Sequence, residues 1–203
     1  SSDVCSSDLF TINENMQSHQ SDLFQKTTTS TVPNIHLVIT NGTATKDADI
    51  FYIDETTTGW DNGYDSSIFG GITNEFAIYT WAVADGNGRN LGIQSLPDNN
   101  YENMIIPVGV NAVSGTTITI DAATNNFPEA INIYLEDKQD NSFTLLDADA
   151  NFSTVLENNL SGIGRFYLHT TSNTLSPYNL VFQIPQSKET PHKFAFAKQF
   201  VPA

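Results

Sequence analysis

An alternating segment that ends in a charged turn constrains the fold of this chain more than any other stretch. Residues 131–138 read INIYLEDK, in which apolar and polar side chains alternate. A period of two is typical of a strand with one buried face. The polar run QDNS follows, and FTLL then begins another apolar run. We therefore predict a β-hairpin with one face in a core and one in water, turning at Glu136, Asp137 and Lys138.

The rest of the chain repeats this kind of signal. Short runs rich in Phe, Tyr, Ile and Thr are separated by Gly, Asn, Asp and Pro, and no segment keeps a helical period over three turns. This pattern predicts about ten to twelve short strands. One of them covers Ile50–Ile53, and Lys46–Asp49 before it is predicted to be a polar loop. The predicted fold class is all-β, an antiparallel β-sandwich or jelly roll.

Alternation also predicts which side chains face the core. Inward positions should be apolar, and their neighbours along the strand should be exposed unless a second layer covers them. The expected core residues are Ile118, Ile120, Ile131, Ile133, Leu135, Phe166 and Leu168. The expected exposed residues are Thr117, Thr119, Asn132 and Tyr134.

The chain divides into four segments by composition. Ser1–Leu9 is what the end of a common sequencing adapter encodes in frame, so we interpret it as a library scar that includes the only cysteine, Cys5. Residues 10–22 are predicted to be a flexible N-terminal segment, and residues 23–171 a single β-sandwich domain. Residues 172–203 form a C-terminal extension, interpreted as linker, truncated or non-native sequence.

The charge balance argues against two classes of partner. Lys and Arg number 8 against 23 Asp and Glu, for a formal net charge of −15. Phosphate backbones and anionic membrane surfaces repel such a chain, so we expect neither nucleic acid binding nor membrane insertion. The charge fits a secreted protein or one that holds cations.

The loop at residues 58–65, TGWDNGYD, contains candidate metal ligands. Asp61, Asn62 and Asp65 place oxygen atoms at spacings that a calcium ion accepts, although no Glu stands at the twelfth position of an EF-hand. The alternative is that these side chains only close turns by bonding to their own backbone. Calcium is thus the only cofactor considered. Further oxygen donors are Asp85, Asn87, Asp147, Asp149 and Asn151.

Aromatic residues in the same loop suggest a second kind of site. Trp60 and Tyr64 are candidate carbohydrate-binding residues, because sugars stack on exposed rings, and core packing is the alternative. The four histidines are far apart in sequence and match no zinc pattern. His36 and His169 each lie on a predicted strand and are interpreted as structural residues.

No motif predicts catalysis. The chain lacks a Gly-x-Ser-x-Gly elbow, a phosphate-binding loop and a dinucleotide-binding glycine pattern. Glu136 and Asp137 could form an acid pair, but neighbours on a strand point to opposite faces. We therefore predict that the chain is not an enzyme.

Nine short motifs between about residues 24 and 171 together resemble a module of secreted Bacteroidota proteins. In those proteins the module usually precedes a type IX secretion sorting domain, which residues after Ile184 do not resemble. The motifs are HLVITN (His36–Asn41), FYI (Phe51–Ile53), TGWDNGYD (Thr58–Asp65), IY (Ile78–Tyr79), LGIQSLP (Leu91–Pro97), IPVGV (Ile106–Val110), TITID (Thr117–Asp121), IYLEDK (Ile133–Lys138) and RFYLH (Arg165–His169).

This resemblance implies an extracellular β-sandwich with no catalytic residues to transfer. We expect a non-catalytic structural or adhesion module, extracellular or on the outer cell surface, whose partner is the rest of a larger parent protein. The alternative is a carbohydrate-binding module that uses Trp60 and Tyr64 on a surface glycan, with or without calcium.

Overall fold

The computed structural model of this protein describes residues 31–69, 74–84, 88–147 and 150–176. The expectations for residues 1–9 and 10–22, and for the extension from residue 177 onward, lie outside these ranges. So do Asp85, Asn87 and Asp149. No helix occurs among the described residues, so none there is long and apolar enough to cross a membrane.

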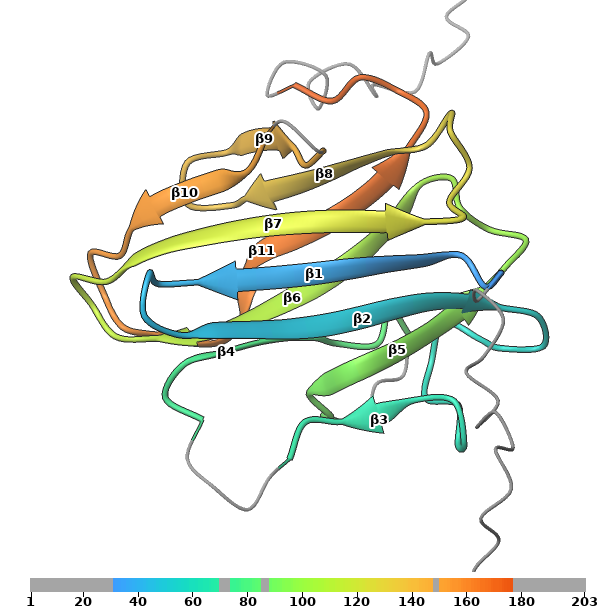
Figure 1. Ribbon diagram of the computed structural model, residues 1–203, viewed down its shortest axis with the longest axis horizontal. Coiled ribbons are helices and arrows are strands. Elements are labelled where there is room, and N and C mark those ends of the chain that lie inside the picture. The colour runs from blue at the N-terminus through green and yellow to red at the C-terminus, as the bar shows by residue number, and fades with distance from the viewer. Residues whose placement is uncertain (1–30, 70–73, 85–87, 148–149, 177–203) are drawn as a thin grey trace, which may run out of the picture. The chain divides into compact units, whose positions relative to one another are not determined.

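Eleven strands make up the described fold (Figure 1). They are β1 (Asn34–Thr40), β2 (Thr45–Ile53), β3 (Ser66–Ser67), β4 (Ala77–Thr80), β5 (Leu91–Pro97), β6 (Met104–Ala112), β7 (Thr117–Asn125), β8 (Asn132–Asp137), β9 (Ser142–Leu145), β10 (Phe152–Val155) and β11 (Leu160–Thr171). The predicted all-β class and the predicted number of strands are both confirmed.

The strands pair into one continuous sheet and not into two stacked sheets. Their order is β10-β7-β1-β2-β5-β4-β6-β11-β8-β9, and β3 pairs with β5 beside this path. The pairing is antiparallel except between β2 and β5, which run parallel. The sheet curls so that the end strands β9 and β10 lie near each other, with an Asp147–Ala150 bridge in the connection between them. The predicted antiparallel sandwich is therefore corrected to a mixed, nearly closed barrel-like sheet.

The longest strand, β11, contains the irregularity that helps the sheet to bend. Its pairing with β6 shifts register between Gly162 and Phe166. Gly162 and Gly164 have φ angles of 110° and 115°, which residues with a Cβ atom rarely adopt. A bulge of this kind bends a strand and increases its twist. The bend lets β11 pair with β6 on one side and β8 on the other.

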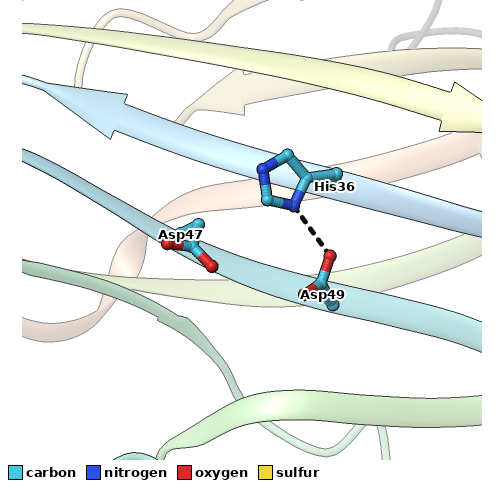
Figure 2. A group of neighbouring side chains, drawn as sticks. All are labelled: His36, Asp47 and Asp49. Carbon is cyan, nitrogen blue, oxygen red and sulfur yellow. Dashed lines mark hydrogen bonds and ion pairs between the residues drawn. The ribbon is translucent and has the colours of Figure 1, made fainter. Parts of the chain in front are cut away.

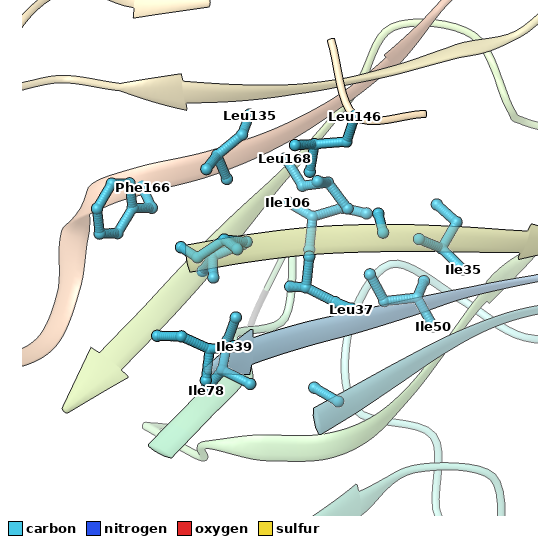
Figure 3. Close-up of a cluster of buried hydrophobic side chains, with 14 of the residues drawn as sticks. Ile35, Leu37, Ile39, Ile50, Ile78, Ile106, Leu135, Leu146, Phe166 and Leu168 are labelled. Atoms are coloured by element: carbon cyan, nitrogen blue, oxygen red, sulfur yellow. The ribbon is translucent and has the colours of Figure 1, made fainter. Parts of the chain in front are cut away.

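The enclosed face of the sheet forms a single apolar core (Figure 3). Ile35, Leu37 and Ile39 of β1 are fully buried, and the other core strands contribute residues at the same alternate spacing. Six of the seven expected core residues are buried as predicted: Ile118, Ile120, Ile133, Leu135, Phe166 and Leu168. Ile131 is only half-buried, because it precedes the first residue of β8.

The predicted polar loop Lys46–Asp49 is wrong, because these residues belong to β2. Ala48 is buried, while Asp47 and Asp49 on either side of it face outward. The acidic side chains on the outer face made this stretch resemble a loop in the sequence, although acidic and apolar residues alternate there as in a strand. The expectation for β7 holds better, since Thr117 is exposed and Thr119 is partly exposed.

A tyrosine ring of β4 lies against a glycine of the neighbouring strand, β6. Tyr79 pairs with Gly109, and a Cβ at Gly109 would lie 2.0 Å from a carbon of the Tyr79 ring. The Tyr79 hydroxyl donates to Asn111 Oδ1 at 3.2 Å, and the same oxygen accepts the Gly162 N–H. Gly109 therefore allows an aromatic ring to cover the sheet and to join β4, β6 and β11.

We expect Gly109→Ala to destabilise the fold by about 1–3 kcal/mol, because the new methyl group must displace a buried ring. Thermal unfolding should show a midpoint lower by about 2–4 °C per kcal/mol. Gly92→Ala in β5 is the matched control, since its Cβ would meet Ile68 at 3.4 Å, an ordinary contact. Equal midpoints for the two variants would contradict this account of Gly109.

Candidate functional site

The loop that the sequence analysis selected is held together by the carboxylate of Asp61. Its Oδ2 accepts the Thr57 N–H at 2.6 Å, and the Thr57 hydroxyl lies 3.1 Å from both carboxylate oxygens. The Asp61 carbonyl in turn accepts the N–H groups of Tyr64 and Asp65. This is the geometry of a side chain that closes a turn on its own backbone.

Asp65 anchors the same loop to the sheet. It is buried, its Oδ1 accepts the Ser95 N–H at 2.6 Å, and its Oδ2 accepts the Asp61 N–H at 2.7 Å. Burial raises the pKa of the Asp65 carboxyl, and the two N–H donors act in the opposite direction. Asn62 is exposed. The three candidate metal ligands thus lie in one loop, and two of them already serve backbone donors.

The two candidate ligand-binding aromatics differ in exposure. Tyr64 is 46% exposed, whereas Trp60 is partly buried and carries the Arg89 guanidinium 4.3 Å from its ring centroid. Arg89 therefore covers one face of the indole by a cation–π contact. The loop thus has one ring exposed to solvent, that of Tyr64, and one ring covered on one face by a guanidinium group, that of Trp60.

We expect the loop to remain folded without calcium, because its carboxylates are already satisfied by N–H donors. Melting midpoints with added Ca²⁺ and with the chelator EGTA should therefore be equal. Asp65→Ala should lower the midpoint, since it leaves the buried Ser95 N–H and the part-buried Asp61 N–H without their acceptor, at a cost of about 1–3 kcal/mol. Asn62→Ala is the exposed control. A midpoint that rises with Ca²⁺, and does so less in Asp65→Ala, would instead support the calcium interpretation.

The charged end of β8 is buried, which the sequence analysis did not predict. Tyr134 is 6% exposed, Glu136 2% and Asp137 0%. The predicted hairpin of β8 and β9 is present, but β8 lies between β9 and β11 and is covered on both faces. Tyr134 is therefore not exposed, because both faces of β8 are covered, which is the exception that the prediction allowed.

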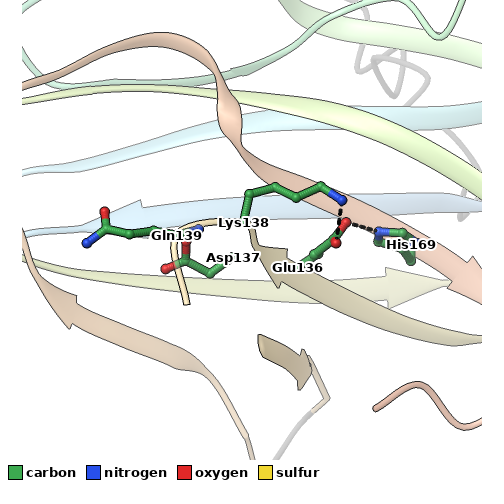
Figure 4. A network of polar contacts seen from close by, with 5 residues as sticks. All are labelled: Glu136, Asp137, Lys138, Gln139 and His169. Carbon is green, nitrogen blue, oxygen red and sulfur yellow. Dashed lines mark hydrogen bonds and ion pairs between the residues drawn. The ribbon is translucent and has the colours of Figure 1, made fainter. Parts of the chain in front are cut away.

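The two adjacent acids of β8 alternate in direction along the strand and bind different partners, and Figure 4 shows those of Glu136. Glu136 lies between Lys138 Nζ at 2.5 Å and His169 Nε2 at 2.8 Å. Asp137 receives two hydrogen bonds from Arg165, from Nε at 3.0 Å and from Nη2 at 2.8 Å. Glu136 and Asp137 thus have separate partners, and the prediction that they do not act together on one substrate stays a prediction. His169 also proves to be a paired structural residue.

Removal of one partner from the Asp137–Arg165 pair should be costly. Arg165→Met leaves a fully buried carboxylate without its cation, and we expect a loss of about 3–5 kcal/mol. Asp137→Asn combined with Arg165→Met should cost less than the two single changes added together. Urea denaturation measures both quantities. The exposed pair His36–Asp49 is the control, since Asp49→Asn should cost no more than about 1 kcal/mol.

A cavity of about 660 Å³ lies beside His169. Phe143, Ile105, Thr170 and Thr171 are among its lining residues, and His169 is the only titratable one among the described residues of the wall. Thr170 and Thr171 direct their hydroxyls to Tyr101 and Glu102, away from His169. Within the described part of its wall, the cavity thus presents one imidazole and no carboxylate.

A smaller cavity of about 370 Å³ has two acids, Asp121 and Asp147, in its wall. Both side chains are exposed. Asp121 accepts the N–H of Ala122 at 2.8 Å. This cavity brings two carboxylates into one wall, so a test for hydrolytic activity includes both of them.

A third group of side chains was missed by the sequence analysis. His36 of β1 and Asp49 of β2 are directly paired across the two strands, and Asp47 lies two residues along β2 (Figure 2). His36 Nδ1 lies 2.8 Å from Asp49 Oδ1, and one ligand atom from each residue lies within 4.8 Å of the other two. Asp47 and Asp49 are two residues apart, so the sequence shows that they lie on one face of a strand. Which residue of β1 lies opposite them depends on the register of the two strands, which the sequence does not give.

The comparisons with known proteins assign a family. Residues 5–169 match a family described as a domain of unknown function, DUF8693. The chain belongs to this family. No curated protein and no solved structure matches it. The family description names no activity, so function must be argued from the geometry above.

Proposed function

We propose that this DUF8693 chain is a non-catalytic structural or adhesion module of a larger extracellular protein. One observation carries the proposal: each buried carboxylate among the described residues has its partners inside the fold. Asp65 accepts two backbone N–H groups, Glu136 binds Lys138 and His169, and Asp137 binds Arg165. Carboxylate oxygens that are buried and already accept hydrogen bonds within the fold support a structural role over general acid–base chemistry.

The other parts of the proposal rest on sequence. The net charge of −15 supports a soluble surface that avoids nucleic acid and does not insert into membranes. The motifs that resemble a module of secreted Bacteroidota proteins support export by type IX secretion and a place beside other domains. The principal partner is then the rest of the parent protein, outside the cell or on its outer surface.

A screen for turnover of polysaccharides, peptides and esters by the purified chain tests the proposal, and we expect none. The matched variants are Glu136→Gln, Asp137→Asn, Asp121→Asn and Asp147→Asn. Turnover that any one of them abolishes would reject the non-catalytic function and would locate the site. Circular dichroism of each variant separates loss of chemistry from loss of fold.

Glycan binding is the second candidate function, supported by the exposure of Tyr64 beside Trp60. An open ring next to a cation-capped ring offers stacking and a hydrogen-bond donor, Arg89, to a sugar. Binding on a glycan array that Trp60→Ala or Tyr64→Ala removes would establish it. Tyr167→Ala is the control, because Lys138 lies over that ring too, 5.3 Å from its centroid, on β11. Dependence on Ca²⁺ would add Asp61, Asn62 and Asp65 to the site.

A further inference from the structure

We propose that His36, Asp47 and Asp49 form a binding site for one divalent first-row transition metal ion, represented here by Zn²⁺. The site lies on the outer face of the sheet, across β1 and β2 (Figure 2). It is separate from the loop at residues 58–65 and from the buried acids of β8. The inference does not depend on the proposed function.

The strand pairing brings the three donors together. His36 and Asp49 are cross-strand neighbours, and Asp47 shares the outward parity of Asp49. Side chains at such positions lie on one face and within reach of each other. β1 is paired along its full length with both β2 and β7, and β2 also pairs with β5 from Asp49 onward, so the backbone that carries His36 and Asp49 is held on both sides and that of Asp47 on one.

The separation of the two closest donors fits a metal ion. A tetrahedral Zn²⁺ ion about 2.0–2.1 Å from an imidazole nitrogen and a carboxylate oxygen holds these two atoms about 3.3 Å apart. His36 Nδ1 and Asp49 Oδ1 are 2.8 Å apart, so they must separate by only about 0.5 Å for an ion to take the place of the hydrogen bond between them. The exposed Asp47 carboxylate, within 4.8 Å, needs only a side-chain rotation to join them.

The charges around the site leave it available to a cation. Of the four Lys and Arg residues in the described part of the chain, Arg89 lies on Trp60, Lys138 binds Glu136 and Arg165 binds Asp137. The fourth, Lys46, lies on the same face of β2 as the buried Ala48. Asp47 lies on the opposite face. Within the described ranges, Asp47 makes no hydrogen bond or ion pair with another side chain.

The donor set selects the class of metal. Calcium takes six to eight oxygen ligands, and magnesium keeps most of its water. One imidazole with two carboxylates suits Zn²⁺ and its neighbours in the first row. Three protein donors leave coordination positions open to water or to a group from another molecule, while the ion ties β1 to β2.

Isothermal titration calorimetry of the full chain with ZnCl₂ tests the site. Cys5, His19 and His192 are other possible zinc ligands in the sequence. The reference protein for the titration, and every variant compared with it, therefore carries Cys5→Ser, His19→Gln and His192→Gln. We expect one ion per chain, and at least about tenfold weaker binding in His36→Gln, Asp47→Asn and Asp49→Asn. CaCl₂ and MgCl₂ should bind at least about tenfold more weakly than ZnCl₂.

Asp121→Asn is the matched control, an exposed acid of β7 on the same outer face of the sheet. It should change the affinity by less than about threefold, since it removes charge but no ligand. Zn²⁺ should also shift the His36 ring nitrogen resonances in an NMR spectrum. No binding up to about 1 mM Zn²⁺, unchanged affinity in His36→Gln, or an equal loss in Asp121→Asn would overturn the proposal.

Discussion

The described fold depends on one constraint: a sheet with an apolar face and no helix to cover it must enclose that face itself. Among the described residues there is no helix, and the sheet curls until β9 and β10 lie near each other. Closure around one core replaces the second layer of a sandwich. Two local features make the closure fit, the bulge after Gly162 in β11 and the contact of Tyr79 with Gly109.

The closure also explains why charged residues are buried. Once β8 is covered on both faces, Glu136 and Asp137 lose water and need partners within the fold. The bulge in β11 places Arg165 beside Asp137, and the Arg165 carbonyl accepts the Lys138 N–H. A buried ion pair adds little stability by itself, but an incorrect register would leave its charges unpaired. The pair therefore favours one alignment of β8 against β11.

The same sheet divides the acidic residues into two groups. Those buried by closure, such as Asp65 and Asp137, are occupied by donors of the fold. Those on the outer face, such as Asp47 and Asp49, are exposed or partly exposed, and Asp49 is paired with His36. Surface groups are thus the ones that another molecule or an ion can reach. This division links the non-catalytic proposal to the metal-binding proposal, although each is tested separately.

The sequence by itself determined the all-β class and most of the core, because a period of two is a property of a single strand. Alternation alone placed Ile118, Ile133 and Leu168 inside. Only the tertiary structure decided that one sheet curls on itself, that Glu136 is buried, and that His36 meets Asp49. Those outcomes depend on register and closure between distant segments, and a one-residue shift changes every partner without changing the local pattern.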